Sequence, residues 1–366
     1  MHFSSLTAYA LLAPLAVCSK IWVTEVPDYV RPYAIPHYEG HAVSIGDQVY
    51  RFPVTGPSSG YAFTLLGTNS QSSTELGVLP HTHQRHYENF FNFKGRFQLW
   101  SQYGNETQQT RILSQGDYGG VPENTIHTFQ ILDPDTEMTG IISPGGFEDL
   151  FYTLADSNYT SSTLSPYSPS TSNSSSSPPA SVIAALESFD VYAQLDFVNR
   201  VDAVDGAAPS SSVWHTGANA LGADSLHGAF IAKDYGVKYL YNGTATGTAS
   251  TYQIVQPFVT PVQSAGNFTL STITMSKNSR AAAETCSFPG HAAFEVLDGK
   301  LSFAMLNETI ELLSGDVVFV PAGTEYAYWS DIAFTKTLHI SAGAVGLDSE
   351  LIGKAVAWDY PVWPTS

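Results

Sequence analysis

The sequence predicts a mostly β protein built from two similar small barrels, and three observations support this prediction. Runs that alternate apolar and polar residues, typical of strands with one buried face, recur along the chain. The 29 glycines and 21 prolines favour short strands joined by turns. The two halves also share landmarks at similar spacings. The clearest runs are QVYRFPV from Gln48, YAFTLLG from Tyr61, GRFQLW from Gly95, KLSFAML from Lys300 and DVVFVPAG from Asp316.

The shared landmarks indicate a duplicated barrel. The matching pairs are Phe63-Thr64-Leu65 with Phe268-Thr269-Leu270, Phe93-Lys94-Gly95-Arg96-Phe97 with Leu297-Asp298-Gly299-Lys300-Leu301, and Gly116-Asp117 plus Pro122 with Gly315-Asp316 plus Pro321. The spacings between them agree to within a few residues. With 43% hydrophobic and 13% aromatic residues, the 366-residue chain can fill two compact cores.

The chain divides into four predicted regions. Residues 1–19 are expected to be a secretory signal peptide, because the apolar run from Leu6 to Val17 is too short to span a bilayer and ends in small residues. The Ser/Thr/Pro tract over residues 156–180 predicts a linker, since it has hardly an aliphatic side chain to bury. The other two regions are an N-terminal barrel domain over residues 20–155 and a C-terminal barrel domain over residues 181–366.

Charge and sequence motifs indicate where the protein works. The net charge of -18 repels phosphate backbones and anionic membrane surfaces, so neither nucleic acid nor a membrane is an expected partner. A secreted, extracellular glycoprotein is expected, because passage through a eukaryotic secretory pathway suits the N-x-S/T sequons. These lie at Asn105, Asn158, Asn173, Asn242, Asn267 and Asn307.

Four residues of the first half have the spacing of a metal site. His81 and His83 are two apart, so a barrel strand sends both side chains inward. Glu88 lies five residues after His83, so a turn or bulge must intervene before its carboxylate can reach the same space. His127, five residues after Pro122, begins another expected strand. Such converging polar groups inside a barrel are far easier to satisfy around a cation than around one another.

The spacing of these residues resembles that of a known superfamily. His81-x-His83-x4-Glu88-x6-Gly95 is similar to the first metal motif of the cupins, and Gly116-x5-Pro122-x-Asn124-x2-His127 is similar to the second. Asn124 and Glu75 stand where cupins usually have glycine. The resemblance implies a bicupin, that is, two cupin-type barrels with a few short helices, joined by the Ser/Pro-rich linker.

The second half keeps the landmarks without the ligands. Aligning Gly299 with Gly95 places Thr285, Ser287 and Ala292 at the positions of His81, His83 and Glu88, and Tyr326 at that of His127. We therefore expect no metal ligands in the C-terminal barrel.

A wider resemblance covers nearly all of the chain after residue 19. The stretches RPYAIPHYEG, VTGPSSGYAFTLLGTN, LPHTHQRHYENFF, PGGFEDLFY and VWHTGANAL resemble the fungal quercetin 2,3-dioxygenases. This resemblance implies one copper ion per chain in the N-terminal barrel, molecular oxygen and a flavonol substrate whose central ring opens to a depside and carbon monoxide. Glu88, as the only carboxylate among the four groups, is expected to take the flavonol proton as well as to bind metal.

A planar aromatic substrate needs a flat apolar slot. Phe90 and Phe129 each lie two residues beyond a ligand and are expected on the metal's side, although each also suits plain barrel core. The resemblance adds Tyr50, Thr68, Met138 and Phe147 as pocket residues.

Two other kinds of protein fit parts of the pattern. A non-catalytic binding or storage bicupin explains the barrels and the secretion but has little need for an intact ligand set. An oxalate-type oxidase or decarboxylase would keep the metal and want cations such as Arg85, Lys94 or Arg96 near it. Three imidazoles suit copper, nickel, zinc or iron alike, so the ligands alone leave the metal open. The oligomeric state is open as well, a homodimer being one alternative.

Overall fold

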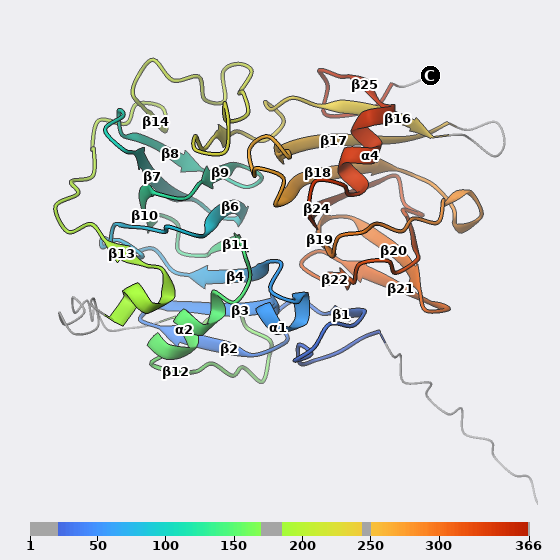
Figure 1. Cartoon of the computed structure of the whole chain (residues 1–366), viewed down its shortest axis with the longest axis horizontal. Coiled ribbons are helices and arrows are strands. Elements are labelled where there is room, and N and C mark those ends of the chain that lie inside the picture. The colour runs from blue at the N-terminus through green and yellow to red at the C-terminus, as the bar shows by residue number, and fades with distance from the viewer. Residues whose placement is uncertain (1–20, 170–184, 244–249, 365–366) are drawn as a thin grey trace, which may run out of the picture.

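The computed structural model describes residues 21–169, 185–243 and 250–364. Within these ranges the chain forms two strand-rich halves that lie side by side, with few and short helices (Figure 1). The predicted signal peptide lies outside the described residues. No described helix has the length and apolar character needed to cross a membrane. The prediction of a mostly β fold with two barrels is confirmed.

The N-terminal barrel consists of a sheet of eight strands, in the order β12-β2-β3-β4-β11-β6-β9-β15, facing a sheet of six, in the order β13-β5-β10-β7-β8-β14. The strand bounds are β2 Ala42–Ile45, β3 Gln48–Val54, β4 Thr64–Ser70, β5 His81–Thr82, β6 Tyr87–Lys94, β7 Phe97–Tyr103, β8 Gln109–Leu113, β9 Tyr118–Val121, β10 Thr125–Ile131, β11 Thr136–Ser143, β12 Ser157–Asn158, β13 Tyr192–Ala193, β14 Ala207–Ala208 and β15 Phe230–Ile231.

The C-terminal barrel pairs an eight-stranded sheet, β1-β22-β19-β24-β18-β17-β16-β25, with a three-stranded one, β21-β20-β23. Its strands are β1 Tyr33–Ile35, β16 Tyr239–Gly243, β17 Thr251–Val259, β18 Phe268–Ser276, β19 Ala292–Asp298, β20 Lys300–Met305, β21 Glu308–Leu313, β22 Val317–Val320, β23 Tyr326–Trp329, β24 Phe334–Ala342 and β25 Val356–Ala357. The short helices are α1 Gly56–Ser59, α2 Glu148–Leu154, η1 Glu187–Phe189, η2 Arg280–Ala282 and α4 Leu347–Lys354.

Strand pairing does not divide at the Ser/Pro tract. β1, from the start of the chain, pairs with β22 of the C-terminal barrel, while β13, β14 and β15, all beyond the tract, pair with strands of the N-terminal barrel. The tract itself begins with β12, an edge strand on β2. Its residues 170–180 lie outside the described part of the chain. The two halves therefore hold each other through exchanged strands as well as through packing.

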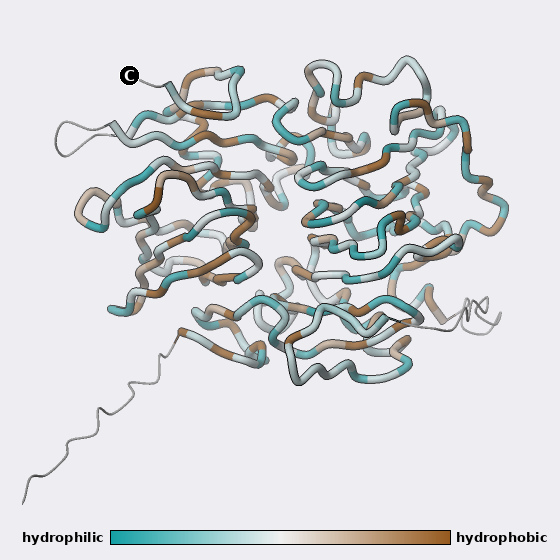
Figure 2. Tube along the Cα trace, turned by 180° about the vertical axis from the view of Figure 1, so that it is seen from behind, coloured by the Kyte–Doolittle hydropathy of each residue, from teal (hydrophilic) through white to brown (hydrophobic). Residues whose placement is uncertain are grey.

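Apolar side chains fill each barrel and the contact between the barrels. Figure 2 shows hydrophobic and hydrophilic residues alternating along the strands in both halves. One buried cluster fills the C-terminal barrel around Phe294, and another joins the two larger sheets through residues such as Phe91 and Phe258. Two smaller clusters lie inside the N-terminal barrel, one around Phe129 and one around Phe147. They flank the space that receives the candidate site.

The landmark glycines have the same role in both halves. Gly95 and Gly299 each follow the strand that carries, or would carry, the glutamate ligand, and both have positive φ, at 69° and 80°. An added Cβ would lie 2.5 Å from the carbonyl oxygen of Asp135 in one barrel and 2.3 Å from that of Phe334 in the other. Only glycine fits such a turn, which explains why the sequence repeat was visible there.

Candidate metal centre

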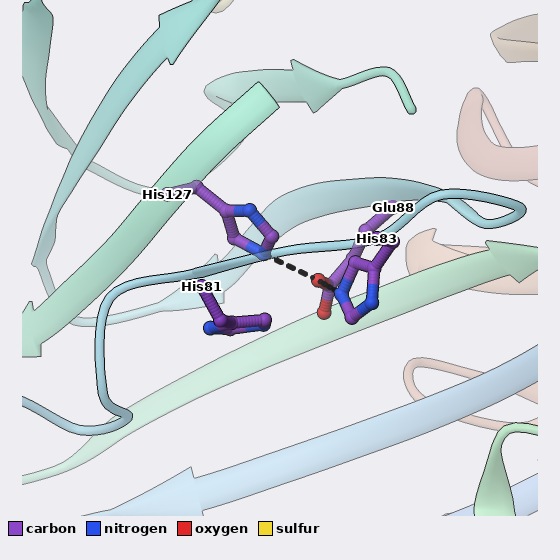
Figure 3. A group of neighbouring side chains, drawn as sticks. All are labelled: His81, His83, Glu88 and His127. Atoms are coloured by element: carbon purple, nitrogen blue, oxygen red, sulfur yellow. Dashed lines mark hydrogen bonds and ion pairs between the residues drawn. The ribbon is translucent and has the colours of Figure 1, made fainter. Parts of the chain in front are cut away.

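The four predicted ligand side chains converge between the two facing sheets of the N-terminal barrel (Figure 3). His81 lies on β5, directly opposite His127 on β10 of the same sheet. Glu88 reaches in from β6 of the other sheet. One ligand atom of each group lies within 4.8 Å of the others. The chain bends between His83 and Glu88, as their odd spacing requires.

Each of the three imidazoles is held through Nδ1. In every case Nδ1 donates to a backbone carbonyl oxygen, because a carbonyl can only accept. The acceptors are Leu79 for His81 at 2.7 Å, Asp190 for His83 at 2.8 Å and Thr125 for His127 at 3.1 Å. These bonds fix ring orientation and leave each Nε2 without the ring proton, the form in which imidazole binds a metal.

The donor atoms fit a metal ion. His83 Nε2 lies 3.2 Å, and His127 Nε2 2.8 Å, from the same oxygen of Glu88, Oε2. Because Nδ1 of each ring already donates to a carbonyl, Nε2 can approach the carboxylate oxygen this closely only with positive charge between them, supplied by a second ring proton or by a shared metal ion. Three imidazoles and one carboxylate form a borderline-soft set that suits a first-row transition metal.

Burial and neighbouring charges set the protonation of the cluster. Burial alone would raise the pKa of the Glu88 carboxyl, but its contacts with His127 and His83 outweigh burial and lower the pKa well below the usual range. Burial, reinforced by His127 and His83, lowers the pKa of His81 well below its ordinary value. Glu88 is therefore an anion and His81 a neutral base at neutral pH, the states that metal ligation requires.

The six predicted pocket residues are all buried, and all except Thr68 pack in the two clusters of the N-terminal barrel. The Phe147 ring centroid lies 5.0 Å from that of His83, and the Phe90 centroid 6.0 Å from that of His127. Phe90 and Phe147 therefore flank two of the ligands with aromatic surface. The others extend this interior: Phe129 packs 6.0 Å from Phe90, and Tyr50, Thr68 and Met138 pair in a row across β3, β4 and β11.

Phe147 reaches the cluster because of a local anchor. It lies at the start of α2, whose first residue, Glu148, is buried. Glu148 accepts hydrogen bonds from Gly56 N at 2.7 Å and from Thr64 Oγ1 at 2.6 Å. These bonds tie the helix start to α1 and β4, and so set the ring of Phe147 over His83.

The predicted glycosylation sites are at the surface wherever the structure describes them. The exposed asparagines are Asn105, Asn158, Asn242, Asn267 and Asn307. Asn173 falls in the range 170–184, outside the described residues.

Sequence reasoning missed Asp190. It lies just after η1, is fully buried, and contacts His83, Gln84, Arg85 and His86. His86, a loop residue between His83 and Glu88, is buried against it. No local sequence signal connects Asp190 with residues 81–88, since these contacts span more than 100 residues.

The register corrects the alignment of the second barrel by one residue. His127 bridges to His81, whereas Tyr326 bridges to Cys286. Asn124 N donates to His83 O, and in the other barrel Gly323 N donates to Phe288 O. Cys286 and Phe288, rather than Thr285 and Ser287, therefore match the two histidines. Counting back from Gly299 failed because Glu88 lies five residues after His83, whereas Ala292 lies only four residues after Phe288.

Comparisons with known proteins show which family the chain belongs to. The chain is 54% identical over 352 residues to the quercetin 2,3-dioxygenase of Aspergillus japonicus. The aligned residues cover 94% of this chain and 99% of that protein. It is 31% identical over 134 residues to the quercetin 2,3-dioxygenase of Bacillus subtilis strain 168. This alignment covers 37% of this chain and 38% of that protein. No family model matches the sequence.

Among solved structures, an oxalate decarboxylase from Lactobacillus farciminis in complex with formate matches with a TM-score of 0.50 at 12% identity, covering 88% of this chain and 89% of that chain. At this identity the match concerns the fold alone, and it confirms the prediction of two cupin-type barrels. The sequence identity over nearly the whole chain shows more: the chain belongs to the quercetin 2,3-dioxygenase family.

Proposed function

We propose that the protein is a copper-dependent dioxygenase that opens the central ring of flavonols such as quercetin with molecular oxygen. The products are a depside ester and carbon monoxide. The observation that carries the proposal is the convergence of His81, His83, Glu88 and His127 in one partly buried cluster, in a chain 54% identical to a quercetin 2,3-dioxygenase.

The metal is proposed as copper, held by the three Nε2 atoms and by Glu88. Three neutral imidazoles suit copper, and the family relation selects it among the metals that such ligands accept. When bound there, copper supplies a redox-active Lewis acid next to the substrate oxygen.

The protein's own groups then bind the flavonol and remove its proton. Glu88, the carboxylate of the ligand cluster, accepts the proton of the flavonol 3-hydroxyl. Phe90 and Phe147 offer aromatic faces beside the ligands, and planar rings pack well against such faces. Their burial keeps bulk water from the reacting carbon atoms, which protects reactive species from hydrolysis.

The surroundings of the cluster favour an aromatic substrate over oxalate. A small dianion needs cations, and the ligand segments contain three candidates. Lys94 forms an ion pair with Asp135, and Arg96 with Asp133 at 2.8 Å, both at the surface. Arg85 has 68% of its side chain exposed and lies 3.6 Å from Asp190. All three are thus paired with acids, whereas aromatic rings flank the ligands.

The proposal includes secretion and glycosylation. It is supported by the short apolar run from Leu6 to Val17 and by the exposure of the sequon asparagines that the structure describes. Mass determination of the purified protein before and after enzymatic removal of N-glycans tests both points.

Gas analysis tests the reaction. Copper-loaded protein should consume quercetin and oxygen in equal amounts and release one carbon monoxide per turnover, with both atoms of labelled oxygen in the depside and neither in the gas. Oxalate should be left untouched. Protein that binds copper and quercetin but releases no carbon monoxide would contradict the proposal and favour a binding protein.

A further inference from the structure

A segment beyond the Ser/Pro tract lies against β5, the strand that carries His81 and leads into His83. We call residues 190–194 the clamp segment. Its strand β13 pairs with β5, with Ala193 opposite His81 and Tyr192 opposite Thr82. Gln194 N donates to Pro80 O at 2.7 Å. β5 is therefore held on one edge by the clamp segment and on the other by β10.

Asp190, the first residue of the clamp segment, holds the loop between two ligands with its carboxylate. It accepts hydrogen bonds from Gln84 N at 3.1 Å, from Arg85 N at 2.9 Å and from His86 Nδ1 at 2.7 Å. Bonds from several donors to one buried carboxylate are charge-assisted and strong. They fix the backbone of the bend that leads from His83 to Glu88.

The backbone of Asp190 acts on a ligand directly. Its carbonyl oxygen accepts the Nδ1 proton of His83 at 2.8 Å, across 107 residues of sequence. Asp190 has φ of 65°, in the left-handed region, and this turn aims the carbonyl at His83 while the carboxylate turns toward the loop. One residue thus sets both the ring of His83 and the path of the chain after it.

We propose that Asp190 is a positioning residue of the metal centre. The ligands of the N-terminal barrel are thus held in place by a residue from beyond the Ser/Pro tract. The inference rests on the proposed metal function of the cluster. Hydrogen-bonded partners of metal ligands typically change metal affinity by roughly 10–100-fold. The Asp190 carboxylate acts on the ligands only through the bend between His83 and Glu88, so its loss should weaken metal binding by about 10-fold, the lower end of that range.

Asp190→Asn is the variant of choice. Asparagine tolerates positive φ, so the carbonyl that binds His83 can stay in place. Its side chain keeps a single acceptor oxygen and turns a donor toward the three donors of the loop. His86→Leu removes only one of the three bonds and should have a smaller effect.

Asp117→Asn is the matched control. Asp117 is also fully buried and also links the N-terminal barrel to residues beyond the Ser/Pro tract. It accepts from Ser114 N at 2.7 Å, Ser114 Oγ at 2.9 Å, Lys233 N at 2.8 Å and His215 Nε2 at 2.9 Å. Neither Asp117 nor these partners belong to the ligand cluster, so the control reports what loss of a buried carboxylate does to stability alone.

The experiment measures metal affinity of the full chain by competition with a chelator, together with the electron paramagnetic resonance spectrum of bound Cu(II). Both aspartate variants should lower the melting temperature. Only Asp190→Asn should also weaken copper binding, by about 10-fold, and alter the spectrum. Wild-type affinity and spectrum in Asp190→Asn, or an equal loss of affinity in Asp117→Asn, would overturn the proposal.

The same titrations with Co(II) separate this inference from the proposed function. Wild-type protein that binds cobalt but no copper would refute the copper assignment. The contrast between the two aspartate variants in cobalt affinity would still decide the role of Asp190.

Discussion

The two barrels have similar backbone folds but bury different side chains at equivalent positions. His127 lies opposite Ser101 in one barrel, and Tyr326 lies opposite Met305, the matching residue, in the other. Where the first barrel turns polar groups toward a common centre, the second stacks the Tyr326 ring on Phe303, with centroids 5.2 Å apart and planes 8° from parallel. The fold therefore does not depend on the ligand set.

The second barrel has nonetheless kept polar groups inside. Tyr326 OH, Ser341 Oγ and both ring nitrogens of His339 are buried without a hydrogen-bond partner. Burial lowers the pKa of His339, although Asp348 opposes the shift, so the ring is neutral. An unpaired buried polar group costs about 1–3 kcal/mol. The first barrel avoids this cost for its ligand imidazoles. Each of these rings donates from Nδ1 to a backbone carbonyl and turns Nε2 toward the candidate metal centre.

The largest effect is expected from His127→Ala. The variant removes one of three imidazoles, and metal affinity should fall by more than the roughly 10–100-fold typical of supporting residues. Dioxygenase activity should disappear with the metal. Tyr326→Phe, at the equivalent place in the other barrel, should retain full metal content and activity in the same assays. Equal losses in both variants would refute the division of roles between the barrels.

Glu88→Gln should separate turnover from metal binding. The imidazoles remain, so most of the copper should stay bound, while the base that takes the flavonol proton is lost. General bases typically contribute about 10²–10⁴-fold, and turnover should fall within that range. Near-native turnover with full copper would assign proton removal to another group.

The contact between the barrels should make stability depend on pH through Glu295. Burial, reinforced by Glu137, raises the pKa of Glu295 from 4.5 to about 8. Its Oε1 accepts from Thr139, and its Oε2 has no partner. Glu137 itself is held by His37 and Tyr38, and Arg51 lines the same small cavity.

Because the folded state holds this proton more tightly than the unfolded chain, its contribution to stability is complete below pH 4.5 and is lost as pH rises through about 8. One pKa unit corresponds to about 1.4 kcal/mol, so the free energy of unfolding should drop by a few kcal/mol over that range. Glu295→Gln should remove the drop. Urea denaturation at pH 5 and pH 9 measures this drop. If the free energy of unfolding of the variant fell by as much as that of the wild type, another group would be responsible for the pH dependence.

The smallest effect is expected from Tyr326→Phe on stability. Removal of a buried hydroxyl without a partner relieves its desolvation penalty, so the free energy of unfolding should rise by about 1 kcal/mol. Denaturant titration checks this. A clear loss of stability would mean that the hydroxyl has a partner, such as a buried water.

The features that could be predicted from the sequence, the metal ligands and the duplicated barrel, are those that local spacing determines. His81, His83 and Glu88 lie on one strand, one bend and the next strand, and His127 follows a turn that repeats in the second half, so motif spacing was enough. The glycine turns at Gly95 and Gly299 made the duplication visible because no other residue fits them.

The remaining features depend on contacts distant in sequence. The pairing of β13 with β5, and the bond from His83 to Asp190, span more than 100 residues, and no periodicity encodes them. The pairing of β1 with β22 crosses almost the whole chain for the same reason. A loop shortened by one residue before Ala292 shifted the alignment of the second barrel, because counting from a distant glycine cannot detect a deletion.

Metal content per chain tests the central claim most directly. If the N-terminal barrel alone is a metal centre, elemental analysis of purified, copper-loaded protein should give one copper per chain, and His127→Ala should bring this close to zero. Two ions per chain, one of which survives in His127→Ala, or no metal in the wild-type protein after loading, would contradict the account.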